Sequence, residues 1–168
     1  PPSLIHAIMS FILACSIRNI RSIQQFHAHK SMLIHVTKFV DPQGIISEEI
    51  RLLFNSILEC LKEDSENKKI FHRSLKSIYE TYFMKDTIEF NDEKKPTITY
   101  EKLLHNENGI KFCISEISRH IVKMSGNTSK PDYEDYKTKQ GFGLMTIIIG
   151  GDKLSRGVTF DGLSTSYF

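Results

Sequence analysis

An almost wholly apolar run, Leu144–Ile149, constrains the fold of this chain more than any other feature. It ends in three consecutive isoleucines, and two glycines, Gly150 and Gly151, follow it directly. Short runs that are apolar throughout, rather than at alternate positions, are typical of strands buried on both faces of a parallel sheet. The run therefore predicts a strand in a parallel sheet that is covered by helices.

Other segments extend this pattern along the chain. Three further short runs predict strands: Ser31–Thr37, His120–Ser125 and Leu163–Phe168. Between them, apolar residues recur at helical spacing in four segments, which begin near Leu4, Ile46, Phe71 and Ile110, the first reaching about Arg21. Strands separated by helices predict an α/β fold, a three-layer domain with a mostly parallel sheet.

The remaining segments are polar and predict connections. We expect a break at Asp41–Gly44, a charged connector over Lys62–Lys69, an exposed loop over Glu89–Thr97, and a polar segment that continues to Gln140. Thr99 is placed to cap a short helix through Leu104. Residues 62–108 together suggest a helical and loop insertion. Since parallel sheets bind ligands at the carboxyl ends of their strands, the loops after Thr37, Ser125 and Ile149 are the first places to look for a site.

The composition is that of an ordinary globular protein, with 40% hydrophobic and 25% charged residues. A length of 168 residues predicts one domain over 1–168. The net charge of +2 is too small to indicate a nucleic-acid or membrane partner from bulk electrostatics. The apolar stretch Leu4–Ile17 is shorter than a bilayer span, so we expect no membrane partner. Cys15, Cys60 and Cys113 stand apart among apolar residues, which predicts buried thiols in a reducing cytoplasm.

The segment Gly150–Leu163 is the most unusual in the chain. It leaves the apolar run through two glycines, contains Lys153 and Arg156, and has further glycines at 157 and 162. Glycines let a backbone approach a ligand closely, and free amides with hydroxyl and guanidinium groups can bind phosphate oxygens. A phosphate-binding loop is one interpretation. The other is a tight connection between strands, whose glycines serve turn geometry and whose Arg156 is solvated or paired with Asp161.

The carboxyl-terminal part, Thr146–Phe168, closely resembles the signature of the Z-one domain, a family often labelled as endonucleases. The start of the chain also agrees, through Pro1–Leu4, Ala14–Arg18 and Ser31–Val36. The resemblance therefore brackets the whole chain, although residues 62–108 contain no motif that matches the family.

The Z-one family is itself similar to superfamily-two helicases and translocases. Their second lobe, of the RecA-like P-loop NTPase type, has a strand followed by a Ser/Ala-Arg-Gly-x-Asp/Thr loop, which Ser155–Thr159 matches. By this likeness Ser31–Val36, His120–Ser125 and Thr146–Ile149 correspond to strands of that lobe. The likeness implies nucleic-acid contacts for Lys153, Ser155, Arg156, Gly157 and Thr159. It implies coupling to the nucleotide for Gly150, Gly151 and Asp161.

Two features depart from the helicase pattern. Gly150 and Gly151 stand where helicases commonly have a Thr-Asp pair, and no Gly-x-x-x-x-Gly-Lys-Ser/Thr motif occurs, since Gly126–Lys130 has the wrong spacing. The chain also begins at Pro1 without an initiator Met and ends within an extended segment. We therefore expect a piece of a longer protein that is inactive as an NTPase alone. The resemblance implies ATP and magnesium for the parent, and no tightly bound cofactor for this piece.

Carboxylates in Pro131–Lys137 provide a test of the endonuclease label. A Pro-Asp and an Asp-x-Lys element occur there, as in nucleases that bind a divalent metal, but the two elements almost overlap. We expect a solvated acidic loop, which Tyr133 and Tyr136 attach to the sheet, rather than a metal site. We likewise expect His27 and His29 to lie in a basic surface turn, and His35 to be a core histidine.

Together these features predict the motor-lobe-like portion of a nucleic-acid-dependent NTPase in the cytoplasm. Its partners would be nucleic acid, most simply DNA, and the missing NTPase lobe of the same chain, with a role in DNA processing, restriction or defence. Two alternatives stay open. One is a metal-dependent DNA endonuclease, with Asp132, Glu134, Asp135 or Asp161 on the metal, and the other is a non-catalytic lobe that binds DNA or protein.

Overall fold

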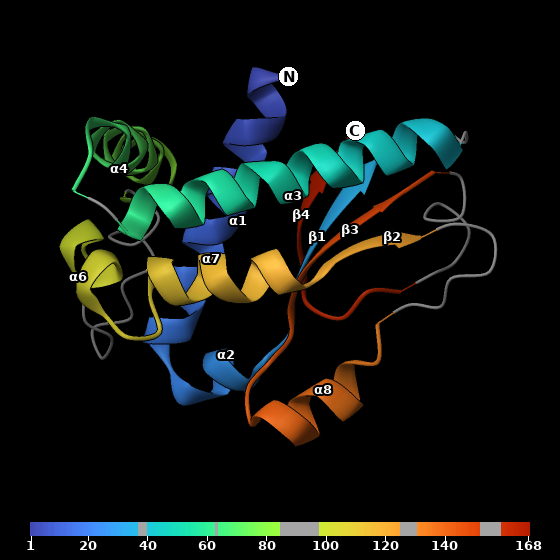
Figure 1. The fold of residues 1–168 in the computed structure, drawn as a ribbon. Helices are drawn as coiled ribbons and strands as arrows, with labels where there is room; N and C mark the ends of the chain where they lie inside the picture. The colour runs from blue at the N-terminus through green and yellow to red at the C-terminus, as the bar shows by residue number, and fades with distance from the viewer. Residues whose placement is uncertain (37–39, 63, 85–97, 125–130, 152–158) are drawn as a thin grey trace. The chain divides into compact units, whose positions relative to one another are not determined.

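The computed structural model describes residues 1–36, 40–62, 64–84, 98–124, 131–151 and 159–168 (Figure 1). These residues form two compact units. The first consists of residues 1–26 and 57–114, and the second of residues 27–56 and 115–168. The chain is mixed α/β and its described strands all pair in parallel, which confirms the expected α/β class with a parallel sheet.

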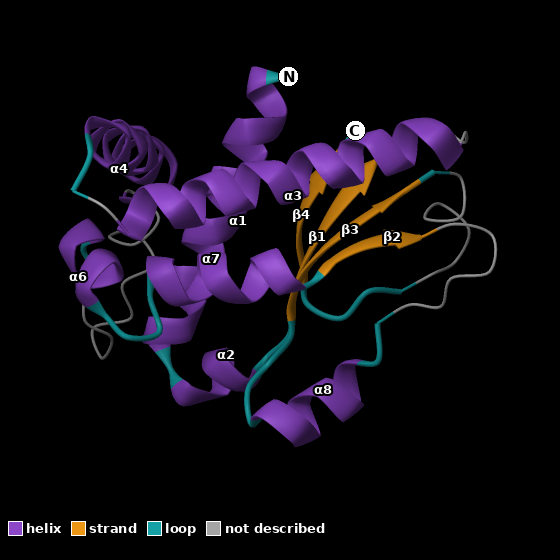
Figure 2. Ribbon diagram, viewed as in Figure 1, coloured by secondary structure: helices purple, strands orange, loops and turns teal. Residues whose placement is uncertain are grey.

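The second unit is built on a sheet whose four described strands have the order β2-β3-β1-β4 (Figure 2). The strands are β1 (Lys30–His35), β2 (Ile121–Met124), β3 (Met145–Gly150) and β4 (Leu163–Tyr167). All six residues of β3 are buried, as its continuous apolar run predicts, whereas the edge strand β4 is largely exposed. All four predicted strands are therefore confirmed.

One helix of the second unit begins earlier than predicted. α3 (Val40–Lys62) starts before Pro42, so the expected break at Asp41–Gly44 is wrong. Proline is tolerated in a first turn, where its missing N–H would have no partner within the helix. The buried face of α3 begins with Gln43 and Ser47, which are 3% and 6% exposed, and continues through apolar residues from Ile50. Apolar periodicity could not reveal a buried face that starts with polar side chains.

A second helix of this unit lies in the segment predicted to be an acidic loop. α8 (Tyr133–Gln140) is capped by Asp132, whose Oδ1 accepts a hydrogen bond from the backbone N–H of Asp135 at 2.9 Å. It ends at Gly141, which has a φ of 75°. The loop prediction is wrong because α8 buries Tyr133 alone and so has no apolar stripe for a periodicity search to find.

The first unit is helical in its described residues. It contains α1 (Pro2–Arg21), most of the short α2 (Ile23–His27), α4 (Glu66–Ile78) with its π-helical extension η1 (Tyr79–Phe83), α6 (Tyr100–His105) and the first half of α7 (Ile110–Arg119). α1 contacts α4 and α6. The predicted cap is confirmed, since Thr99 Oγ1 accepts from the N–H of Lys102 at 3.2 Å. Cys15 and Cys113 are buried, as predicted, whereas Cys60 is partly exposed, and none of the three is in a disulfide.

The segment 62–108 lies within this first unit, and its assignment as an insertion stays a prediction. Its charged connector is shorter than expected. Ser65 caps α4 by accepting from the N–H of Lys68 at 3.2 Å, so Glu66–Lys69 form the first turn of a helix. The predicted loop at Glu89–Thr97 lies outside the described residues.

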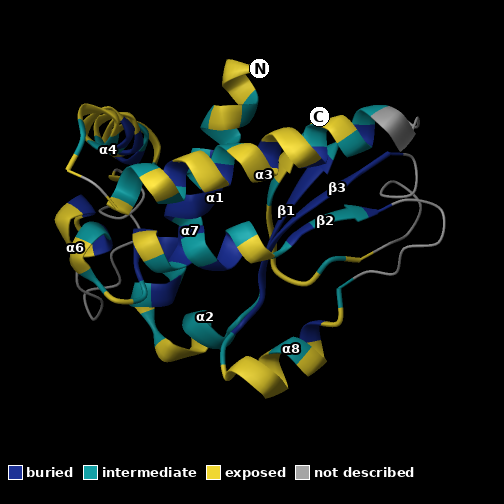
Figure 3. Ribbon diagram, viewed as in Figure 1, coloured by how far each residue is buried: buried dark blue, intermediate teal, exposed yellow. Residues whose placement is uncertain are grey.

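α1 is the one described helix whose length and composition would suit a bilayer span. Half of its most apolar window is buried inside the protein, and Figure 3 shows this mixture of buried and exposed positions. Its fully buried residues include Phe11, Ile12 and Leu13. The expectation of no membrane partner therefore stays a prediction.

Candidate functional site

The carboxyl ends of β1 and β3 lie side by side at the centre of the sheet. After β1 the chain proceeds to β2, which lies beyond β3, and after β3 it proceeds to β4, which lies beyond β1. The connections of two neighbouring strands thus lead in opposite directions, and right-handed crossovers of this kind leave on opposite faces of a sheet. Open α/β sheets bind ligands at such a topological switch point, which makes this end of the sheet the candidate site.

We call this region the carboxyl edge and define it by His35, Val36, Gly150 and Gly151. The N–H of Val36 donates to the carbonyl of Gly150 at 2.9 Å, which holds the two strand ends together. Both glycines are buried, and the ring centroid of His35 lies 5.7 Å from that of Phe168. His35 is partly exposed rather than a core residue, because it is the last residue of β1. Before the register is known, a strand end cannot be distinguished from a strand centre.

The amino-terminal part of α3 lies near Lys123 of β2. A Cβ added to Gly44 would lie 4.0 Å from Nζ of Lys123 in β2, so the Lys123 ammonium group lies near the start of α3. Further along α3, Arg51 donates to the carbonyl of Ile121 at the start of β2, at 2.8 Å. α3 thus runs back along β2 from its carboxyl end. A helix amino terminus and a lysine both favour bound anions, and the sequence alone did not single out Lys123.

The opposite end of the sheet, which we call the amino edge, is closed by α8 and by the turn before β4. Tyr133 is 4% exposed, and its hydroxyl lies 3.1 Å from Oγ of Ser31 at the start of β1. Ser31 Oγ in turn donates to the carbonyl of Asp161 at 2.8 Å, so the tyrosine donates to the serine. Burial raises the pKa of Tyr133, which keeps this donor protonated.

His29 adds a second contact to the amino edge. Its Nδ1 accepts from the N–H of Leu144 at 3.0 Å, and its ring packs edge-on against Tyr133 with centroids 5.0 Å apart. Burial lowers the pKa of His29, although the nearby charges of Asp161 and Glu134 oppose the shift. The neutral ring is the form that accepts this hydrogen bond.

Tyr136, one turn after Tyr133, attaches α8 to the end of α7. Its hydroxyl donates to Oε2 of Glu116 at 2.9 Å, and Arg119 Nη1 lies 2.7 Å from Oε1 of the same carboxylate. Glu116 is only 6% exposed, and each of its two carboxylate oxygens has one of these groups as a partner, as buried polar groups require. Burial, and then the hydrogen bond to Glu116, raise the pKa of Tyr136. Tyr133 attaches its segment to the sheet as predicted, whereas the hydroxyl of Tyr136 bonds to α7, and the segment is a helix rather than a loop.

Two glycines allow the backbones at the amino edge to approach closely. Gly162 has a φ of 67°, and a Cβ there would lie 1.8 Å from the carbonyl oxygen of His29. A Cβ on Gly143 would lie 2.1 Å from the carbonyl oxygen of Ala28. Gly162 therefore has the turn and packing role that the second interpretation of Gly150–Leu163 gave to its glycines.

A family model described as Z1 domain matches residues 3–168. The chain belongs to the Z1 domain family. The resemblance of Thr146–Phe168 and of the first 36 residues to this family is thereby confirmed, whereas the likeness to helicases stays a prediction. No curated protein and no solved structure matches the chain.

The predicted nucleic-acid contacts of this Z1 domain lie largely outside the described residues, since these exclude Lys153, Ser155, Arg156 and Gly157. Thr159 is described and is exposed. Gly151, which precedes these residues, lies at the carboxyl edge, and β4, which follows them, begins at the amino edge.

The residues predicted to couple to nucleotide are separated by the Z1 domain fold. Gly150 and Gly151 lie at the carboxyl edge, whereas the backbone of Asp161 is bonded to Ser31 at the amino edge. Along the six residues of β3, the two edges are about 17 Å apart. The two glycines and Asp161 therefore do not form one compact site.

Carboxylates in the α8 region of the Z1 domain have structural partners. Asp132 caps the helix, and Asp135 lies 2.7 Å from Nζ of Lys139, while Glu134 is exposed. His29 bonds to a backbone amide. Within the described part of the chain, no group of three or more His, Cys, Asp or Glu side chains is placed to hold a metal ion.

Proposed function

We propose that this Z1 domain chain is the second-lobe-like portion of a nucleic-acid-dependent NTPase that acts on DNA, in DNA processing, restriction or defence. The observation that supports this most directly is the topological switch point between β1 and β3. The segment with the Ser-Arg-Gly sequence leaves the sheet from this point, through Gly150 and Gly151. Ligand-binding loops of open parallel sheets occupy the same topological position.

The chemistry of the proposed site follows from its residues. Arg156, with Ser155 and Thr159, would contact phosphates of the nucleic-acid backbone, since guanidinium and hydroxyl groups are common phosphate donors. Lys153 adds positive charge and Gly157 permits close approach of the backbone.

The nucleotide would be ATP with magnesium, held mainly by another part of the parent protein, because this chain contains no Gly-x-x-x-x-Gly-Lys-Ser/Thr motif. Lys123 and the start of α3, which lie near each other, would add positive charge near the nucleotide. ATP supplies the phosphoanhydride bond, and the residues of this chain would orient nucleic acid relative to it. Asp161 can influence nucleotide only indirectly, because its backbone is bonded at the amino edge.

The proposal is tested on the full-length parent protein by measuring ATP hydrolysis and strand cleavage in one magnesium-containing reaction, with and without double-stranded DNA. We expect DNA to stimulate hydrolysis, and Arg156→Ala to lower the stimulated rate about tenfold, because each lost charge-assisted phosphate contact is worth about 1.4 kcal/mol or more. Lys139→Ala is the matched control. It removes an exposed cation of α8, far from the carboxyl edge, and should leave the stimulated rate unchanged.

Two results would contradict the proposal. Equal stimulation in Arg156→Ala and Lys139→Ala would remove the assigned role of the Ser-Arg-Gly segment. DNA cleavage that needs magnesium but no ATP would instead support the endonuclease alternative.

A further inference from the structure

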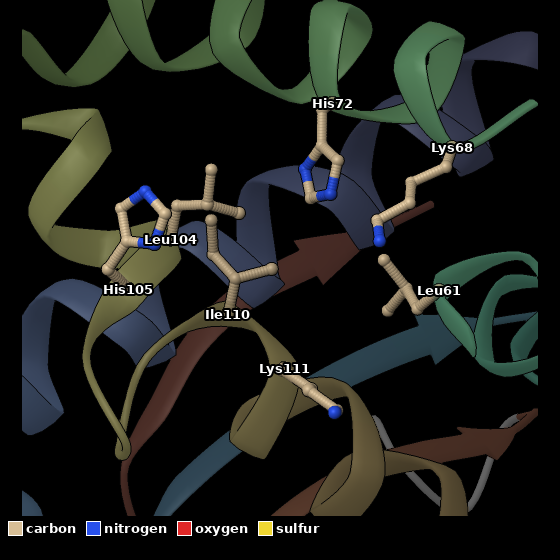
Figure 4. Close-up of a pocket in the computed structure, with 7 residues that line it drawn as sticks. All are labelled: Leu61, Lys68, His72, Leu104, His105, Ile110 and Lys111. Carbon is tan, nitrogen blue, oxygen red and sulfur yellow. The ribbon is translucent and has the colours of Figure 1, made fainter. Parts of the chain in front are cut away.

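The first unit contains a pocket of about 310 Å³ that is unrelated to the carboxyl edge. Four helices supply its lining, in the order Leu61 of α3, Lys68 and His72 of α4, Leu104 and His105 of α6, and Ile110 and Lys111 of α7. Figure 4 shows Lys68 and His72 reaching into the pocket from α4, with Lys111 on the opposite side and the aliphatic side chains between them. The volume lies at the lower end of the range for small-molecule sites, about 300 to 1,000 Å³.

The centre of the pocket is apolar. Ile110 is 1% exposed, and Leu61 and Leu104 are partly buried beside it. Aliphatic side chains that remain accessible within a concavity favour a ligand with an apolar body, since that body would remove their surface from water.

Every polar side chain in the lining is a lysine or a histidine. The described residues offer no carboxylate to the lining, and the nearby Glu101 lies 3.6 Å from Nε2 of His105 on the exposed side of α6. The pocket thus combines an apolar centre with positive or neutral nitrogen donors, a set that suits an anion.

The two lysines of the pocket differ from three other lysines of the same unit, although Lys102 of α6 likewise forms no ion pair with a described residue. Lys62, Lys69 and Lys76 each lie within 4.0 Å of a glutamate, at 2.6, 3.9 and 4.0 Å. Lys68 and Lys111 form no ion pair with any residue that the structure describes. Lys68 is also partly buried, and a cation that is partly removed from water is stabilised by an opposite charge.

His72 experiences this positive potential. Its Nδ1 lies 3.3 Å from the hydroxyl of Tyr100, which donates to the backbone carbonyl of His72 at 3.1 Å. These contacts fix the ring beside Lys68, one helical turn away. Burial, and then the charge of Lys68, lower the pKa of His72.

We propose that this pocket binds a small organic phosphate. Its phosphoryl group is bound by Lys68 beside His72, and its apolar body lies on Leu61, Leu104 and Ile110. Lys111 adds positive charge from the opposite wall. A phosphate dianion suits two uncompensated lysines better than a single carboxylate does, and lysine is a common phosphate ligand.

The test uses the whole chain labelled with ¹⁵N, and phenyl phosphate as the probe. Titration should shift amide resonances of residues 61–72 and 104–111, with an affinity about tenfold higher than for inorganic phosphate, because only phenyl phosphate buries the apolar centre. Lys68→Gln should weaken binding about tenfold, and Lys111→Gln about threefold, since Lys111 is exposed. The matched control is Lys69→Gln, which alters the neighbouring lysine of α4 that pairs with Glu66 and should bind as the parent does.

Three results would overturn the proposal. They are no binding of phenyl phosphate at millimolar concentration, shifts confined to amides outside the pocket, or equal affinities of Lys68→Gln and Lys69→Gln. The amide spectrum of each variant reports whether it is folded. Since Lys111 is exposed, Lys111→Gln keeps the test decisive if Lys68→Gln is not folded.

Discussion

The two ends of the parallel sheet are built differently, although the same strands join them. At the amino edge, side chains of α8 and α7 bond to strand starts and to one another, and Gly143 and Gly162 bring backbones into close contact. At the carboxyl edge, the two central strands end in a backbone hydrogen bond between Val36 and Gly150, beside two buried glycines.

This difference bears on the stability of the two edges. Buried hydrogen bonds and tight glycine contacts make the amino edge costly to alter. At the carboxyl edge, the described contact between the two central strands is made by backbone atoms, which a side-chain substitution leaves in place. The same division between a structural and a ligand-binding end is general among parallel α/β sheets.

The largest effect on this comparison should come from Gly162→Ala. The added Cβ would lie 1.8 Å from the carbonyl oxygen of His29, and the φ of 67° is itself unfavourable for alanine. We expect the free energy of unfolding, measured by urea denaturation, to fall by about 3 kcal/mol or more. Gly141→Ala measures the cost of a positive φ without a steric clash, because Gly141 has a φ of 75° but no atom lies within 4 Å of an added Cβ. It should cost about 1 kcal/mol, and similar losses in the two variants would show that close packing at Gly162 is unimportant.

An intermediate effect is expected for Tyr133→Phe. This change removes the hydroxyl that donates to Ser31 and leaves the buried ring in place, so the free energy of unfolding should fall by about 1 kcal/mol. Thr159→Ala alters an exposed position just before β4. It should change the free energy of unfolding by less than about 0.5 kcal/mol. If Thr159→Ala were the more destabilising variant in urea denaturation, the assignment of stability to the amino edge would be wrong.

The smallest effect is a dependence of stability on pH. Burial lowers the pKa of His29, His72 and His120 below the ordinary value of 6.5, so the unfolded chain binds more protons than the folded chain in mildly acidic solution. Their contribution to stability is complete above pH 6.5 and is lost as the pH falls from 6.5 through the folded pKa values. The free energy of unfolding should therefore fall between about pH 7 and pH 5. His29→Asn, whose Oδ1 can still accept from Leu144, should make this fall shallower, and an unchanged profile would remove His29 from the effect.

Much of the fold could be predicted where one physical signal dominates. The continuous apolar run of β3, the helical stripe of α3 from Ile46 and the cap at Thr99 are local patterns, and the structure confirms each of them. The start of α3 and the whole of α8 could not be predicted. Their buried positions are occupied by Gln43, Ser47 and Tyr133, whose burial depends on partners distant in sequence.

For the candidate site, the sequence indicated the loop after Ile149 and placed Asp161 in the same functional group. The strand order shows instead that Asp161 lies at the other end of the sheet from Gly150. The structure also brings His35 and Lys123 to the candidate site, a place that the sequence did not predict for either residue.

The sequence by itself determined the α/β class, the four strands and membership of the Z1 domain family, because apolar periodicity and a long motif are properties of neighbouring residues. Only the tertiary structure decided which strands adjoin, where the switch point lies, and which lysines lack carboxylate partners around the pocket of the first unit. Strand order and side-chain pairing join residues up to about 130 positions apart, as in the contact of Ser31 with Asp161, and local sequence does not encode such contacts.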